Sequence, residues 1–113
     1  MTDHQWVKEF PGAITVCDRE GIILELNDQA EKTFADDGGR KLIGTNLLDC
    51  HPEPSRTQLK QMLETGQANI YTIEKKGKKK LIYQSPWYAE GRYAGFVELS
   101  LEIPAAMPHF VRG

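Results

Sequence analysis

Residues 68–103, ANIYTIEKKGKKKLIYQSPWYAEGRYAGFVELSLEI, decide the fold of this 113-residue chain. They contain three runs rich in β-branched and aromatic residues, at 68–75, 79–88 and 92–103. Turn residues divide the runs, at Lys76-Gly77-Lys78 and at Glu90-Gly91. Such runs joined by short turns are typical of hairpins, so the pattern predicts three consecutive strands in an antiparallel meander.

A further hairpin is predicted near the N-terminus. Residues 13–17 and 22–26 are rich in apolar and β-branched residues, and Asp18-Arg19-Glu20-Gly21 separates them. Gly21 can adopt the left-handed conformation that closes such a turn. Asn27 or Asp28 then provides an N-cap for a short helix over residues 28–35.

The middle of the chain predicts one clear helix. Ser55-Arg56-Thr57-Gln58 fits a capping box, and an apolar stripe follows up to Gly66 as a C-terminal stop. Residues 42–48 are irregular, and residues 6–10 form a helical turn that Pro11-Gly12 ends. Two strands, then helices, then three strands predict an α+β fold.

Composition indicates one ordinary globular domain. Hydrophobic residues make up 40% of the chain and charged residues 27%, both near the globular average. No apolar run reaches the roughly 20 residues of a membrane span, and no signal peptide is recognisable, so we expect a cytoplasmic protein without a membrane partner. Two cysteines without CxxC spacing predict free thiols and no structural metal site.

The formal charge of −2 gives no general attraction to nucleic acid, and no nucleic-acid motif is present. The charge is uneven, because five lysines cluster at the predicted turn of the meander, at positions 75, 76, 78, 79 and 80. Two interpretations stay open. The cluster is either a docking patch for an acidic partner or a solvated turn that guards the sheet against edge aggregation.

The order of elements resembles the PAS sensor fold. The local marks are Asp18-x-x-Gly21 followed by Asn27, Leu42-Ile43-Gly44, Ser85-Pro86, and Gly91 shortly before Gly95-Phe96. The resemblance implies a five-stranded antiparallel sheet, with helices inserted between strands two and three covering one face. It divides the chain into a cap segment at 1–12, a PAS-like domain at 13–104 and a tail at 105–113.

The departures from the family pattern are informative. Flavin-binding light sensors of the family carry Gly-x-Asn-Cys, whereas this chain has Gly44-Thr45-Asn46-Leu47, so a flavin adduct is not expected. The frequent Asp-Ile-Thr ending is replaced by Glu102-Ile103-Pro104. No kinase, cyclase or DNA-binding segment follows, so we expect a stand-alone chain whose output passes through an unidentified signalling protein.

Which sheet face meets the helices is open, because residues two apart share a face and a slip of one residue exchanges the faces. The ordinary rule buries the more apolar parity under the helices. The resemblance implies the reverse, with the mixed face toward a ligand cavity. The implied ligand contacts are Cys50, His51, Thr72, Gln84, Glu98 and Ser100. The other face would then form a homodimer through Trp6, Phe10, Tyr83, Val97, Leu99 and Leu101.

Cys50-His51-Pro52 is the most chemically suggestive triplet. A structural role is one interpretation, and contact with a ligand, haem or a redox signal is the other. The leading hypothesis is a non-catalytic PAS module for signal transduction, including regulation of transcription, that binds a small molecule or a protein partner. A haem or thiol redox sensor using Cys50 and His51 is the alternative. A small enzyme using Cys50, His51 or Glu98 is a weaker one, since no nucleophile-base motif is present.

Overall fold

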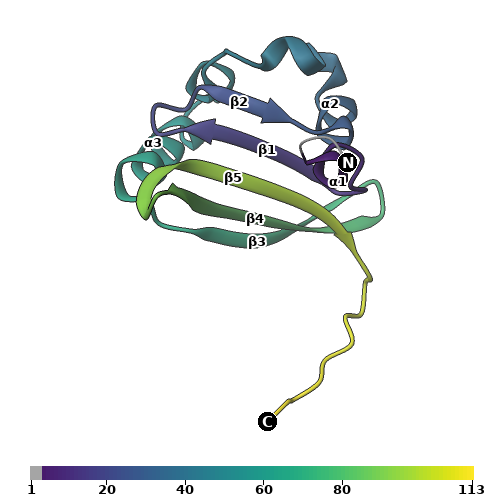
Figure 1. Ribbon diagram of the computed structural model, residues 1–113. Helices are drawn as coiled ribbons and strands as arrows, with labels where there is room; N and C mark the ends of the chain where they lie inside the picture. The colour runs from purple at the N-terminus through teal and green to yellow at the C-terminus, as the bar shows by residue number, and fades with distance from the viewer. Residues whose placement is uncertain (1–3) are drawn as a thin grey trace.

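The computed structural model describes residues 4–113, so the first three residues of the predicted 1–12 cap segment lie outside the described residues. Five strands form one antiparallel sheet (Figure 1): β1 (Ala13–Asp18), β2 (Ile23–Leu26), β3 (Asn69–Lys75), β4 (Lys78–Ala89) and β5 (Arg92–Ile103). Their order across the sheet is β2-β1-β5-β4-β3. The predicted α+β class and the antiparallel meander are confirmed.

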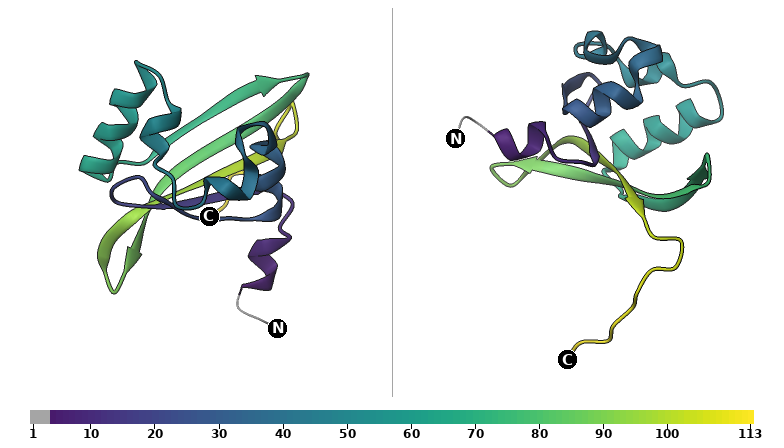
Figure 2. Two further views of the ribbon diagram at one scale, coloured as in Figure 1. Left: turned by 90° about the horizontal axis from the view of Figure 1, so that it is seen from above. Right: turned by 90° about the vertical axis from the view of Figure 1, so that its right-hand side faces the viewer.

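All but one of the helical segments described lie between β2 and β3 in the chain: α2 (Asp28–Thr33), the 3-10 turns η1 (Ala35–Asp37), η2 (Gly39–Leu42) and η3 (Leu47–Cys50), and α3 (Ser55–Thr65). They form a layer over one face of the sheet, which we call the inner face (Figure 2). The short helix α1 (Gln5–Lys8) lies on the other side, near one end of the outer face.

Local side-chain hydrogen bonds shape the entry into this helical layer. The Asp18 carboxylate accepts from the backbone N–H groups of Glu20 and Ile22, and Gly21 completes the turn at φ 89°. Asn27 is the N-cap of α2, and its side-chain oxygen accepts from the Ala30 N–H at 3.0 Å. The predicted hairpin and cap are both confirmed.

The start of α3 differs from the prediction. Ser55 is already helical, and no capping box forms. Instead, the Glu53 carboxylate accepts from both the backbone N–H and the hydroxyl of Thr57, at 2.9 and 2.7 Å. A carboxylate there satisfies an otherwise orphaned N–H of the first turn. The helix ends as predicted at Gly66, which adopts the left-handed conformation at φ 69°.

Two buried clusters join the sheet to the helical layer. One packs β1 and β2 against α2 and contains Ala13, Ile23, Leu26 and Ala30. The other packs β1 and β5 against α3 and contains Cys17, Leu63 and Phe96. The cores are small, and Leu47 packs against both of them.

Strand β4 continues through Ser85-Pro86 to Ala89, where sequence rules alone would end it at Ser85. Pro86 lies opposite Phe96, and the register shifts just beyond it, between Trp87 and Tyr88. The Trp87 indole N–H then donates to the backbone carbonyl of Cys17 at 2.9 Å. Proline inside a strand is generally found beside such an irregularity, and Pro86 follows this rule.

The register of β3 corrects one predicted face. The turn between β3 and β4 has two residues, Lys76 and Gly77, both with positive φ, so Lys75 pairs with Lys78. The sequence predicts a three-residue turn, Lys76-Gly77-Lys78. The shorter turn shifts the pairing by one residue and places Tyr71, rather than Thr72, opposite the buried Ile82.

Candidate functional site

A cavity of about 380 Å³ lies between the inner face of the sheet and the helical layer. This volume falls within the roughly 300–1,000 Å³ of small-molecule sites. Apolar side chains form much of its wall, with Phe34, Leu42, Leu47, Leu59 and Met62 on the helical side and Ile23 and Phe96 on the sheet. The cavity can therefore receive an apolar body of small size.

Polar groups cross the sheet side of the cavity in a hydrogen-bonded row. The Asn69 amide donates to the Gln84 side-chain oxygen at 3.2 Å, and the Gln84 amide donates to a Glu98 carboxylate oxygen at 3.0 Å. The three residues lie directly opposite one another on β3, β4 and β5. The row orients the Glu98 carboxylate, which lines the cavity together with Asp37.

Tyr71 lines the same cavity from the edge strand β3 and is 41% exposed. Partial burial, with a smaller effect of the Glu98 charge, raises the pKa of its hydroxyl. The phenol therefore stays protonated at neutral pH and can donate to a ligand. Sequence reasoning missed this residue because it placed β3 one residue out of register.

His51 reaches the cavity from the end of η3. Its Nδ1 lies 2.7 Å from the Leu47 carbonyl oxygen. Because a carbonyl only accepts, Nδ1 carries the proton, and in the neutral ring Nε2 has its lone pair available. Cys50 also lines the cavity, and its residue is exposed overall. The structure therefore brings Cys50 and His51 of the triplet to one site.

Cys17 lies at the sheet side of the cavity and is only 2% exposed. Burial raises the pKa of its thiol, and the nearby Asp18 and Glu98 charges act in the same direction, while a hydrogen bond with the Phe96 backbone opposes them. A thiol held neutral is a poor nucleophile. This environment favours a packing role for Cys17.

The predicted ligand residues divide into three groups. Cys50, His51, Gln84 and Glu98 all line the main cavity. Ser100 lines an adjoining hollow of about 200 Å³ on the same face. Thr72 does not belong to the site, because its position opposite Leu81 puts it on the outer face.

The predicted dimer residues lie on or near the outer face. By register, Tyr83, Leu99 and Val97 share this face, Tyr83 is 39% exposed, and Val97 is also among the residues that line the cavity. Phe10 lies beside Leu101, since a Cβ on Gly12 would collide with both side chains. Trp6, on α1, is 62% exposed. The arrangement forms a partly covered apolar surface opposite the cavity.

Two further observations concern residues 4–113. Within this range no helix is long and apolar enough to cross a membrane. Nor does the same range contain a group of three or more His, Cys, Asp or Glu side chains placed to hold a metal ion.

No protein-family model and no curated protein sequence matches the chain. Solved structures do. The PAS domain of the histidine kinase ThkA is 21% identical and superimposes with a TM-score of 0.60, covering 80% of this chain and 97% of that domain. The Aer2 receptor of Vibrio cholerae, described as a dual PAS-heme oxygen sensor, is 19% identical with a TM-score of 0.59, covering 82% and 95%.

VqmA of Vibrio cholerae, in a structure with bound DPO, is 14% identical with a TM-score of 0.62. The match covers 87% of this chain and 54% of VqmA. At these identities the likeness concerns the fold alone. Two of these neighbours are described with a bound group, heme in Aer2 and DPO in VqmA. The chain therefore has the PAS fold, and its chemistry must be argued from its own residues.

Proposed function

We propose that this chain is a non-catalytic PAS sensor module that binds a small molecule between the sheet and the helices. The observation that carries the proposal is the cavity of about 380 Å³, with an apolar wall and the oriented Glu98 carboxylate. A few placed polar groups in an apolar cavity are the usual composition of a ligand site. Binding would shift the packing of the helical layer and so transmit a signal to a protein partner.

Native mass spectrometry of freshly purified protein tests this proposal. We expect extra mass from a retained or added small molecule. Leu59→Trp, which fills the cavity from α3, should abolish it, whereas Gln61→Trp on the exposed side of the same helix should not. A wild-type chain that retains nothing and binds nothing from a small-molecule library would refute the proposal.

A haem sensor is the second candidate, favoured by His51. Its fixed tautomer leaves the Nε2 lone pair available at the cavity, where it would ligate haem iron, for which imidazole is a common ligand. The haem would supply gas binding or electron transfer. Protein expressed with adequate haem should then show a Soret band that His51→Ala removes and Cys50→Ser retains. A wild-type protein without the band would leave the haem-free sensor.

The outer face supports a homodimer in this proposal. Tyr83, Val97 and Leu99 form an apolar strip on the sheet, and α1 covers only one end of the face. Apolar sheet surface left in water favours association with a second copy. The proposed output is a ligand-dependent change in this dimer, which an unidentified signalling protein recognises. Regulation of transcription is one proposed result of that recognition. The cytoplasmic location stays a prediction.

An enzyme is disfavoured by the site geometry. Within residues 4–113, Cys50 and His51 share no hydrogen bond, and the His51 ring is held by the Leu47 carbonyl oxygen rather than by the thiol. A nucleophile needs a base within hydrogen-bond reach. We therefore expect no substrate turnover that depends on the Cys50 thiol. Turnover that is lost when Cys50 is alkylated would contradict the non-catalytic proposal.

A further inference from the structure

Three lysines share the inner face at the β3–β4 end of the sheet. Lys75 and Lys78 lie directly opposite each other, and Lys80 lies two residues further along β4. Like charges directly opposite on a sheet are destabilising. One carboxylate partly offsets them, since Glu102 lies 3.9 Å from the Lys78 ammonium. Lys75 and Lys80 form no ion pair within the part of the chain that the structure describes.

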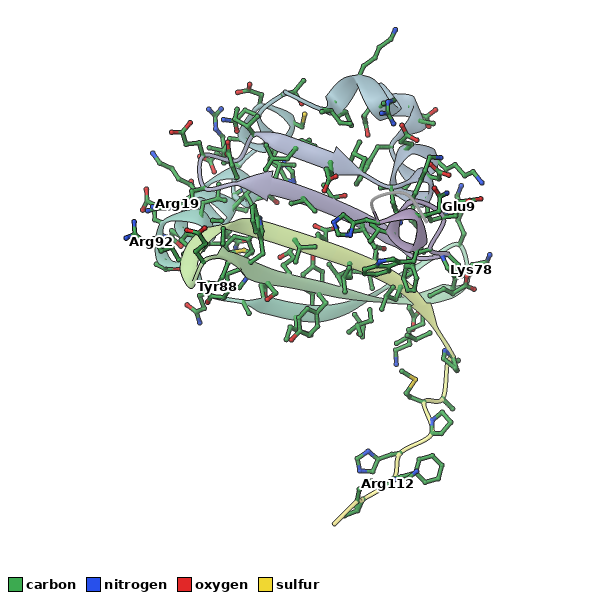
Figure 3. All side chains as sticks on the ribbon, in the orientation of Figure 1. Glu9, Arg19, Lys78, Tyr88, Arg92 and Arg112 are labelled. Atoms are coloured by element: carbon green, nitrogen blue, oxygen red, sulfur yellow. The ribbon has the colours of Figure 1, made fainter. Side chains whose placement is uncertain are left out.

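The outer face of the same hairpin is different. There Glu74 lies opposite Lys79, so the positive and negative charges balance. Protection of a sheet edge explains lysines on β3, which is an edge strand, and Lys80 on the internal strand β4 lies directly opposite Glu102 of β5. Figure 3 shows Lys78 at this end of the sheet, opposite the end that carries Arg19 and Arg92. One carboxylate, Glu102, stands against three ammonium groups at this end of the inner face, and the remaining positive excess needs another explanation.

The hollow of about 200 Å³ supplies that explanation. Lys75, Lys80 and Ser100 line it and bring two ammonium groups and one hydroxyl to one space, whereas the hydroxyl of Thr33, also at its wall, already donates to the Gln29 carbonyl oxygen. Such groups are hydrogen-bond donors suited to carboxylate or phosphate oxygens. The hollow shares Thr15, Phe34, Tyr71 and Glu98 with the main cavity, so the two spaces adjoin.

We propose that the hollow between Lys75 and Lys80 is an anion subsite for the ligand of the main cavity. The ligand class is then an amphiphilic anion, with its carboxylate or phosphate group at the lysines and its apolar body against the cavity wall. Asp37 lines the main cavity but not the hollow, so its carboxylate repels an anion from the main cavity and favours the direction with the anionic group at the lysines, whereas Glu98 lines both spaces. This inference rests on the proposed function and names the ligand class for it.

The test uses three probes of equal chain length: octanoate, octyl phosphate and the neutral octanamide. Binding is followed by calorimetry and by backbone amide chemical shifts in the full chain. We expect both anions to bind more tightly than octanamide and to shift the Ser100 amide. Lys80→Gln and Lys75→Gln should each weaken anion binding about tenfold, the loss of one charge-assisted hydrogen bond. Lys79→Gln, an equal charge change on the outer face, should leave binding within twofold.

The outcomes separate the subsite from the cavity. Tighter binding of octanoate than of octyl phosphate assigns a carboxylate ligand, and the reverse order assigns a phosphate. The subsite is refuted if octanamide binds as tightly as the anions, or if K79Q weakens binding of the anions as much as K80Q does. The cavity then still stands as a ligand site. If no probe shifts any cavity amide, the subsite is refuted, and the proposed function fails with it only when native mass spectrometry also finds no small molecule bound.

Discussion

At the scale of single residues, Asn27 holds three elements together. Its side-chain oxygen accepts from the backbone N–H groups of Ile14 and Ala30, at 2.9 and 3.0 Å. Its amide donates to the carbonyl oxygens of Val7 and Gly12, at 3.1 and 2.8 Å. The residue is 4% exposed, so water cannot replace these bonds. One side chain thereby links α1 on the outer face to α2 beside the cavity.

Asn27→Ala should therefore lower the free energy of unfolding by about 2–4 kcal/mol, because it removes a helix cap and leaves buried N–H groups without partners. Urea denaturation measures this loss. The control is Asn69→Ala, whose exposed amide makes one hydrogen bond to Gln84 and whose loss should change the unfolding free energy by under about 1 kcal/mol. Equal losses in the two variants would contradict the linking role of Asn27.

The Cys17 thiol predicts a pH dependence. Burial raises its pKa in the folded chain above the ordinary value of 9.0, so the unfolded chain loses this proton first as the pH rises. The unfolding free energy should therefore be unaffected by this group below about pH 9 and fall as the pH rises beyond it. Cys17→Ser, which does not titrate there, should show a shallower decline in denaturation curves between pH 8 and pH 10. If the unfolding free energy fell equally steeply with pH in the two proteins, a raised pKa of the Cys17 thiol would be contradicted.

At the scale of elements, the strands were predictable and their faces only partly so. The runs rich in β-branched residues and the glycine-containing turns mark strand existence, because both report local backbone preferences. The face of β3 depends instead on whether the turn after Lys75 holds two residues or three. The expected Lys76-Gly77-Lys78 turn differs from the observed one by a single residue, and that residue exchanges the places of Tyr71 and Thr72.

The candidate site follows the same division. Gln84 and Glu98 lie on long strands whose register the PAS resemblance anticipated, and they line the cavity. The helical wall was not predicted, since Phe34 and Leu42 belong to short 3-10 turns and their neighbours without a clear apolar period. Tertiary packing, rather than local sequence, places these side chains.

The register of β3 makes a prediction about ligand contacts. Tyr71→Ala should weaken binding of a cavity probe such as octanoate by about tenfold, because it removes aromatic surface and a hydroxyl donor from the site. Thr72→Ala, one residue away on the outer face, should leave binding within twofold. Calorimetry on both variants measures the difference. A larger effect at Thr72 than at Tyr71 would indicate the three-residue turn in solution.

At the scale of the whole molecule, the sheet separates two surfaces of different character. The cavity and the hollow lined by Lys75 and Lys80 lie on the inner face, and the apolar strip with α1 lies on the outer face. Strands β4 and β5 carry residues of both surfaces in alternation, as Glu98 and Leu99 illustrate. A ligand that moves the inner side chains therefore acts on the same backbone that presents the outer face.

This separation yields the last prediction, which concerns the homodimer. Leu99→Arg places a charge in the middle of the outer strip and should convert a dimer into a monomer in sedimentation analysis, because an unpaired charge at an apolar interface is costly to bury. Ile43→Arg, an equal change at an exposed isoleucine beyond η2 in the helical layer, should leave the dimer intact. Probe binding should survive in the Leu99→Arg monomer, since Leu99 faces away from the cavity. A wild-type chain that stays monomeric at high concentration would refute the interface, whereas loss of the dimer in both variants would place it elsewhere on the surface.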